Sequence, residues 1–296
     1  MSATYTAASS VDEALEAMAA GARPVAGGTD LVVGARQGKA PLPESLVAIH
    51  RLEELRGIDE VDGGIRIGAL TSHADLTAHP AVRERFTALA DAAAIVGSHA
   101  TRAVGTLGGN LMNASPAAET AGPLICFGAT ATLRGPSGSR ELPVAELFAG
   151  PGSTVAGPDE LLVAVTVPAA AAGTGSCYAR LEYRRQMEIA VVGATAVVTL
   201  AGGDVTAAKV AITALAPTIR LVPEAEAALV KGGSAEQAAA AAAEASAPIS
   251  DVRASADYRR AMATVIARRT IEAALARARG QDVPIPASQA LYGGMQ

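Results

Sequence analysis

The sequence is poor in aromatic residues and in cysteine. Tryptophan is absent and aromatic residues make up 3% of the 296 residues, so a core must be built mainly from Ala, Val, Leu and Ile. The two cysteines, Cys126 and Cys177, are far apart and form no C-x-x-C pair, and the four histidines show no metal-ligand spacing. Cysteines in this pattern predict buried thiols rather than a zinc or iron–sulfur site. We therefore expect no metal in this chain, and any redox chemistry would need an organic cofactor.

The sequence also lacks the signatures of membrane and nucleic-acid proteins. No apolar run approaches the roughly 18 residues that span a bilayer. The first residues, MSATYTAASSVDEAL, contain no basic segment followed by a hydrophobic block, so we expect no signal peptide and a cytoplasmic location. With 24 basic and 29 acidic side chains, the net charge of −5 argues against binding to a phosphate backbone. Half of the residues are hydrophobic, which is enough for a folded core.

The order of turn signals and periodic segments predicts three parts. They are residues 1–57, residues 58–172 and residues 176–287, with the Ala- and Gly-rich stretch 169–175 as a linker. In the first part, Ser10 and Glu13 form a capping-box pattern before a helix over 11–20, and a strand over 23–26 runs into a Gly-Gly turn before a helix over 31–37.

The second part contains two predicted hairpins, which turn at 62–64 and 135–138, a helix over 82–96 and an irregular segment over 97–123. In the third part strands come first and helices follow. The strands are predicted over 176–184, 189–200 and 205–215, and the helices over 223–230, 235–245 and 255–279. This order is typical of an antiparallel sheet covered on one face by a small helical bundle.

The first segment that suggests a binding site is Ala26-Gly27-Gly28-Thr29-Asp30-Leu31. Paired glycines let the backbone approach a ligand closely, and Thr29 or Asp30 can cap the next helix, whose free N–H groups attract anions. Alone, the motif is weak, because such turns are common in proteins that bind nothing.

The second segment covers residues 101–119 and has neither helical nor strand periodicity. Its glycines, hydroxyls and amides could bind a phosphate-bearing ligand, although a purely structural Ω-loop is the alternative. The sequence has no G-x-G-x-x-G after a strand, no P-loop and no G-x-S-x-G elbow. The sequence therefore contains neither a Rossmann site nor a P-loop site, and the missing elbow argues against an α/β-hydrolase.

Together the two segments resemble a known family. AGGTDL from Ala26, followed by R-x-x-G-T-L-G-G-N-L-x-N-A-S-P-A-A-E from Arg102, is similar to the FAD-binding subunits of the molybdenum hydroxylases, and IGALT at 67–71 agrees. The resemblance covers nearly the whole chain. It implies an α+β fold, with a two-subdomain FAD-binding domain like that of vanillyl-alcohol oxidases and a C-terminal domain of antiparallel sheet plus helices.

The resemblance also implies a set of cofactor-binding residues and no catalytic residue. The backbone of the first turn would hold the FAD pyrophosphate, and a group in the second segment would close over it. Main-chain amides of both turns would then clamp the pyrophosphate together. Ser115 and Glu119 would reach the ribityl and flavin end, where the family usually has Asp in place of Glu119. Leu162 and Arg180 match positions near the flavin ring. The first-turn residues are Ala26, Gly27, Gly28, Thr29, Asp30 and Leu31, and the closing residues are Thr106, Gly108, Gly109 and Asn110.

The implied partners are a large molybdopterin-binding subunit and a small subunit with two iron–sulfur clusters, in a dimer of heterotrimers. Electrons would pass from the clusters through FAD to an external acceptor, as in carbon monoxide dehydrogenase or xanthine dehydrogenase. Two alternatives stay open: a free-standing flavin oxidase of the vanillyl-alcohol type, and a nucleotide-binding scaffold without redox function. Such oxidases are usually longer and carry acid–base residues of which the third part offers few, whereas the intact glycine turns argue against the scaffold.

Overall fold

The first part of the chain forms a small parallel sheet. The computed structural model describes residues 4–288 and residue 291, and its strands β1 (Thr4–Ala7), β2 (Arg23–Val25) and β3 (Ser45–Ala48) are arranged in the order β1-β3-β2. Helix α1 (Val11–Ala19) connects β1 to β2. Helix α2 (Leu31–Arg36) follows β2, and the short 3-10 helix η1 (Glu53–Leu55) leads into the next part.

Helix α1 shows why this part folds as predicted. Its buried residues are spaced so that they share one face, and they are Val11, Ala14, Leu15 and Met18. The Ser10 hydroxyl accepts a hydrogen bond from the Glu13 amide, as the capping pattern predicts. The Glu13 carboxylate, however, accepts from the amide and hydroxyl of Ser9, so only half of the predicted capping box forms.

The middle part is an antiparallel sheet of five strands in the order β4-β5-β10-β6-β7. The two predicted hairpins are present, and Asp62 and Gly63 adopt the positive φ angles, 47° and 76°, that a tight hairpin turn requires. A two-stranded ribbon, β8 (Phe148–Gly150) with β9 (Ser153–Thr154), follows the 3-10 helix η2 (Val144–Glu146). The five strands are β4 (Ile58–Val61), β5 (Gly64–Gly68), β6 (Thr130–Gly135), β7 (Gly138–Pro143) and β10 (Leu161–Val167).

The helices of the middle part differ from the prediction in two places. The single helix expected over 82–96 is interrupted at Phe86, whose fully buried ring packs edge-on against Phe127. Two helices result, α4 (Pro80–Arg85) and α5 (Thr87–Ile95). The segment expected to be irregular contains α6 (His99–Val104), α7 (Leu107–Met112) and the start of α8 (Ala121–Cys126). Six-residue helices are too short to show helical periodicity in a sequence.

The third part is a four-stranded antiparallel sheet in the order β11-β12-β13-β14, followed by three helices. The strand expected from residue 189 begins at Val192, and β11 already begins at Thr174, inside the predicted linker. The strands are β11 (Thr174–Leu181), β12 (Val192–Ala201), β13 (Asp204–Thr213) and β14 (Arg220–Leu221). The helices are α9 (Pro223–Val230), α10 (Ala235–Glu244) and α11 (Ala256–Ala278).

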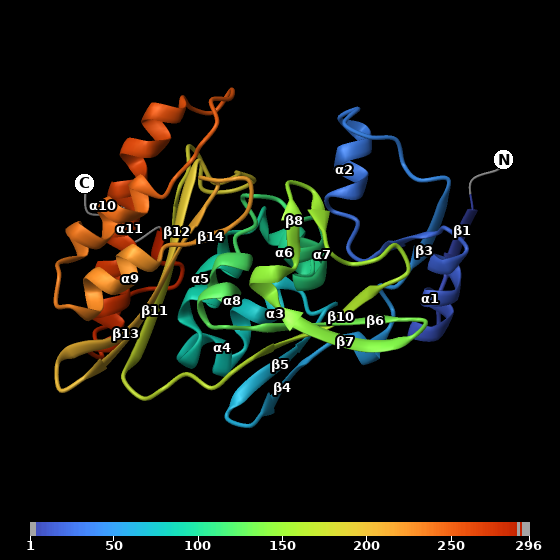
Figure 1. Cartoon of the computed structure of the whole chain (residues 1–296). Coiled ribbons are helices and arrows are strands. Elements are labelled where there is room, and N and C mark those ends of the chain that lie inside the picture. Colours follow the sequence, from blue (N-terminus) through green and yellow to red (C-terminus); the bar gives the residue numbers. More distant parts are fainter. Residues whose placement is uncertain (1–3, 289–290, 292–296) are drawn as a thin grey trace.

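Helices cover both faces of this last sheet. On one face α11 packs on β11 and β12, so closely that a Cβ atom on Gly175 would lie 2.2 Å from the Ala278 nitrogen. On the other face lie α5 and α8 of the middle part (Figure 1). Alternate strand residues therefore enter different cores: Cys177 and Val210 pack towards α11, whereas Tyr178 and Ala211 join the core of the middle part. The prediction that helices of the third part cover one face of its sheet is confirmed. The helices of the middle part cover the other face.

A buried carboxylate ties the middle and third parts together. Asp91 on α5 is fully buried and accepts hydrogen bonds of 2.6 Å and 3.0 Å from the two terminal nitrogens of Arg277 on α11. It also accepts from the backbone amides of Tyr178 and Ala287, so that one side chain joins α5, β11, α11 and the segment after it. Arg277 in turn donates to the carbonyl of Ser176 at 2.8 Å.

A second buried ionisable group lies in α3 (His73–Ala78), which begins with the capping box of Ser72 and Asp75. His73 is 2% exposed, and its backbone amide donates to the carbonyl of Gly105 at 3.1 Å. Burial lowers the pKa of His73 to about 4, and the positive charge of Arg102 acts in the same direction. The imidazole is therefore neutral at pH 7.

The Asp91→Asn variant tests the tie between the two parts. Removing one charge of a buried ion pair costs about 3–5 kcal/mol, because the other charge is left uncompensated. We expect the free energy of unfolding, measured in urea, to fall by about 3–5 kcal/mol in this variant. The control is Glu272→Gln, which breaks the exposed pair with Arg268 and should cost at most about 0.5 kcal/mol. Equal effects of the two variants would contradict the role of Asp91.

His73 predicts a loss of stability in acid. The pKa of His73 is about 4 in the folded chain and 6.5 in the reference state. Between pH 4 and pH 6.5, His73 is therefore protonated in the unfolded chain but neutral in the folded chain. The free energy of unfolding should therefore fall as pH decreases from 6.5 to 4 and be unaffected above that window. Urea unfolding across this range should show a shallower dependence on pH in His73→Gln, and identical slopes would rule the effect out.

Candidate functional site

The first turn, residues 26–31, connects β2 to α2 and offers a row of free backbone donors. Within the described part of the chain, none of the amides from Gly27 to Leu31 donates a hydrogen bond. The predicted caps are not formed either, since Asp30 precedes α2 without a side-chain hydrogen bond to it. Gly28 has a positive φ of 69°, which favours glycine. Consecutive amides without partners form a site for an anion, because the N–H dipoles supply partial positive charge.

The first turn lies directly against the second segment, as the prediction required. A Cβ atom on Gly27 would lie 2.0 Å from the carbonyl oxygen of Val104, the last residue of α6. One on Gly105 would lie 3.6 Å from the hydroxyl of Thr29 and 3.4 Å from the ring of His73. Only glycine allows so close an approach of two backbones. The two turns are therefore in contact although about 80 residues separate them in the sequence.

The second segment does not offer free amides at the predicted positions. The Gly108 amide donates to the carbonyl of Ala69 at 2.8 Å, the Gly109 amide to the hydroxyl of Thr106 at 3.0 Å, and the Asn110 amide to the carbonyl of Thr106 at 3.0 Å. These bonds form because residues 107–112 are the helix α7, with Thr106 as its N-cap. The expectation that backbone amides of both turns clamp a pyrophosphate is wrong for the second turn.

Side chains of the second segment remain able to bind a ligand. The Thr106 hydroxyl accepts from Gly109, and its own hydrogen is still available for donation. The side-chain oxygen of Asn110 accepts from Thr120 at 2.6 Å, which orients its NH₂ group as a donor. Ser115 accepts from the Ala117 amide at 3.2 Å. The first turn thus supplies backbone donors, and the second supplies side-chain donors.

The structure joins two further predicted residues to each other. Glu119 lies after α7 and is 7% exposed, and its carboxylate forms a buried ion pair with Arg180 on β11. Sequence reasoning missed the third member, Glu182, which accepts from Arg180 at 2.6 Å and 2.7 Å. Residues two apart on a strand share a face, so the Arg180–Glu182 spacing was the available signal. Leu162 on β10 is 2% exposed and packs in the hydrophobic core of the middle part.

Burial controls the electrostatics of this region. It raises the pKa of Glu119, and the positive charge of Arg180 opposes the change without cancelling it. Burial would lower the pKa of Arg180, but its acidic neighbours, Glu119 first, outweigh that effect and keep the guanidinium charged. Desolvation also raises the pKa of Asp30, opposed by Lys39. Asp30 acts on Glu119 through its charge, so the end of the first turn and the buried ion pair are electrostatic neighbours.

The described residues provide no metal site. No group of three or more His, Cys, Asp and Glu side chains in residues 4–288 could hold a metal ion. Cys126 and Cys177 are free and buried, and burial raises the pKa of both thiols above its usual range. Likewise, no helix within the described ranges is long and apolar enough to cross a membrane.

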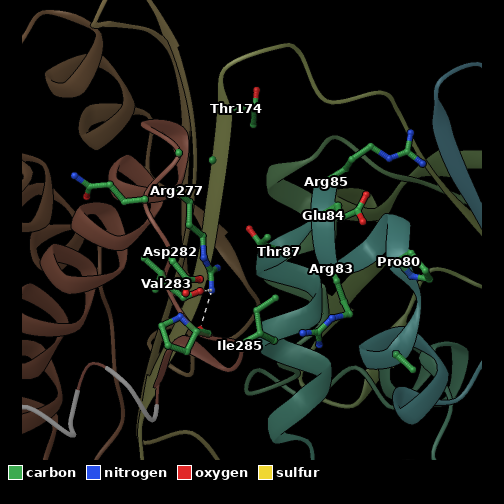
Figure 2. A pocket seen from close by; sticks show the side chains of 15 residues that line it. Pro80, Arg83, Glu84, Arg85, Thr87, Thr174, Arg277, Asp282, Val283 and Ile285 are labelled. Carbon is green, nitrogen blue, oxygen red and sulfur yellow. Dashed lines mark hydrogen bonds between the residues drawn. The ribbon is translucent and has the colours of Figure 1, made fainter.

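A cavity of about 970 Å³ lies elsewhere, between the α4–α5 region and the segment after α11 (Figure 2). Five of its fifteen lining residues are charged, but Arg277 points to Asp91 and Arg85 is paired with Glu60 at 3.0 Å. None of the residues predicted to bind a cofactor lines it. The cavity is therefore separate from the site formed by the two turns.

Comparisons with known proteins identify the family of the chain. Residues 1–170 match the family described as FAD binding domain in molybdopterin dehydrogenase, and residues 177–274 match the CO dehydrogenase flavoprotein C-terminal domain. The carbon monoxide dehydrogenase medium chain of Hydrogenophaga pseudoflava is 34% identical over 280 residues, which cover 92% of this chain and 97% of that protein. A putative xanthine dehydrogenase FAD-binding subunit of Escherichia coli is 31% identical over 220 residues, covering 73% and 75%.

Solved structures show the same likeness. A chain of carbon monoxide dehydrogenase from Hydrogenophaga pseudoflava superposes with a TM-score of 0.89 at 35% identity, covering 94% of this chain and 98% of that one. A chain of quinoline 2-oxidoreductase from Pseudomonas putida 86 gives 0.86 at 29% identity, covering 95% and 98%. Since residues 1–170 and residues 177–274 both match, and the similarity to the Hydrogenophaga chain covers 92% of this one, the chain belongs to the family of FAD-binding medium subunits of the molybdenum hydroxylases.

Proposed function

We propose that this chain is the electron-transferring FAD subunit of a heterotrimeric molybdenum hydroxylase in the cytoplasm. Its partners would be a large molybdopterin-binding subunit and a small subunit with two iron–sulfur clusters, assembled as a dimer of heterotrimers. The reaction, carbon monoxide dehydrogenase-like or xanthine dehydrogenase-like, would be set by the large subunit. We also propose that residues 1–57 and 58–172 are the two FAD-binding subdomains and that residues 176–287 form the C-terminal domain.

The observation that carries this proposal is the row of free amides at the first turn. The amides from Gly27 to Leu31 have no partner among the described residues and lie in contact with the second segment. A dinucleotide has a diphosphate that carries negative charge and accepts several hydrogen bonds. Aligned backbone N–H groups stabilise such an anion without a lysine or arginine. The residues present therefore fit FAD.

The other residues of the site would orient the cofactor. Thr106 and Asn110 would donate from the facing side, with Gly108 and Gly109 allowing α7 to pack closely against Ala69 and Thr106. Ser115, Glu119 and Arg180 would border the ribityl and flavin end, and Leu162 would support the core beneath it. When bound, FAD would supply the redox chemistry by which electrons pass from the partner's clusters to an external acceptor. The protein contributes binding and electrostatics.

Gly27→Ala tests the contact of the two turns. Its Cβ atom would lie 2.0 Å from the Val104 carbonyl oxygen, so the turns must separate and the free amides must shift. We expect the dissociation constant of FAD to rise at least about tenfold, a loss of about 1.4 kcal/mol. The measurement is titration of the apoprotein followed by flavin fluorescence.

The control is Gly34→Ala at the fourth residue of α2, where a Cβ atom meets nothing within 4 Å. Alanine at a helical position stabilises the helix, so FAD binding should be unchanged. If Gly27→Ala binds FAD as tightly as Gly34→Ala does, the proposed contact does not hold the cofactor.

Co-purification tests the subunit role. A tagged chain, produced with its genomic neighbours, should be yellow with one FAD per chain and should carry a large molybdenum-containing chain and a small iron–sulfur chain. A yellow chain that oxidises a substrate without partners would support the free-standing oxidase instead. A chain that stays colourless after soaking in FAD would support the nucleotide-binding scaffold.

A further inference from the structure

Arg102 on α6 is an arginine without a carboxylate partner. Its side chain is partly buried, and its Nη1 donates to the carbonyl of Val96, the C-cap of α5, at 3.1 Å. Across the ranges that the structure describes, no ion pair joins Arg102 to an acidic side chain. Burial lowers the pKa of Arg102, and the positive charge of Arg180 acts in the same direction. The surroundings of Arg102 therefore disfavour its charge.

The carboxylates around Arg180 and the first turn do not pair with Arg102, because each has a cation of its own. Three form ion pairs, and the fourth, Asp30, is acted on by the charge of Lys39. The ion pairs are Glu119–Arg180, Glu182–Arg180 and Glu188–Arg184. A partly buried charge without a direct counter-ion is costly to keep. A costly charge of this kind, retained in a fold, is typical of a functional site.

The charge of Arg102 acts at both ends of the candidate site. It acts on His73, whose ring lies beside Gly105 together with the hydroxyl of Thr29 in the first turn. At the other end it acts on Arg180 of the buried ion pair. The helix that carries Arg102 also ends against the first turn, where the free amides lie. A positive charge in this position attracts an anion bound at those amides.

We propose that Arg102 is a cofactor-positioning residue, and that its guanidinium is the counter-ion of a diphosphate bound at the first turn. This inference rests on the proposed function, which supplies FAD as the dinucleotide. The amides of the first turn attract an anion through partial charges, and Arg102 adds a full positive charge to them. The bound anion in turn compensates the charge of Arg102, which no acidic side chain of the described residues does.

The Arg102→Gln variant separates a role in binding from a role in folding. It removes a charge that burial and Arg180 disfavour, and no described carboxylate loses an ion-pair partner. We therefore expect the free energy of unfolding of the apo chain, measured in urea, to be no lower than in a matched control. An arginine that stabilised the fold through an ion pair would show a marked loss instead.

Arg83→Gln is the matched control. Arg83 lies in the last turn of α4, as Arg102 lies in the last turn of α6, and no described carboxylate forms an ion pair with it. Its Nη1 donates to the carbonyl of Thr77, near the end of α3, at 3.2 Å. Arg83 lines the cavity that is separate from the two turns. The two variants therefore lose the same charge and the same kind of hydrogen bond at different places.

Calorimetric titration of the full apo chain with three ligands locates the effect. FAD carries a diphosphate and a flavin, ADP carries a diphosphate without a flavin, and riboflavin carries a flavin without phosphate. In Arg102→Gln we expect the dissociation constants of FAD and ADP to rise about tenfold, because a charge-assisted interaction is lost. The dissociation constant of riboflavin should stay unchanged, as should all three in Arg83→Gln. Arg102→Lys keeps the charge and should bind FAD within about threefold of the native chain.

Native affinity for FAD and ADP in Arg102→Gln would overturn the inference. An equal loss for riboflavin, or an equal loss in Arg102→Lys, would also count against it, because the effect would then not come from a charge acting on a diphosphate. If Arg102→Gln does not fold, as judged by circular dichroism, Arg102→Met takes its place with the same expectations. If the native chain binds neither FAD nor ADP, the proposed function itself fails, whereas native binding without an effect of the variant refutes the role of Arg102 alone.

Discussion

The contact between Gly27 and the carbonyl of Val104 is the constraint on which the site depends. Two backbones meet there at a distance that leaves no room for a Cβ atom, and they belong to the turn after β2 and to the end of α6. Helix α2 follows this turn and has no buried residue of its own. Its position is therefore set by the contact at Gly27 and by the pairing of β2 with β3. The first turn, with its free amides, is thereby fixed against the end of α6, directly before Thr106, the N-cap of α7.

Two buried arginines extend this constraint to the third part of the chain. Arg180 on β11 pairs with Glu119, and Arg277 on α11 pairs with Asp91. Each of these two arginines therefore joins the third part to a carboxylate of the middle part. Ion pairs out of contact with water are sensitive to the loss of either member. Their geometry therefore specifies how β11 and α11 lie against the middle part.

Much of the fold could be predicted because its signals are local. The hairpins follow from Asp62-Gly63 and Gly135–Gly138, and α1 follows from the spacing of Val11, Ala14, Leu15 and Met18. The first turn follows from Gly27-Gly28, which also carries the family resemblance. The break at Phe86 could not be predicted, because the buried ring of Phe86 packs against Phe127, 41 residues later in the chain.

The differences between the predicted and the observed site also come from contacts between residues far apart in the sequence. Whether the amides of Gly108 and Gly109 are free depends on Ala69 and on the cap at Thr106, and a glycine-rich sequence gives no sign that residues 107–112 are helical. The ion pair of Glu119 with Arg180 joins residues 61 apart. Interactions at such separations are determined by tertiary packing, and only the Arg180–Glu182 spacing on one strand was visible in the sequence.

The sheet between the two helical layers has a consequence for dividing the chain. The family matches meet between residues 170 and 177, which suggests a natural place to separate two fragments. Yet Tyr178, Val197 and Ala211 belong to the core of the preceding part. Cutting there would expose an apolar sheet face together with the unpaired charge of Arg277, and isolated halves with such surfaces associate or aggregate in water.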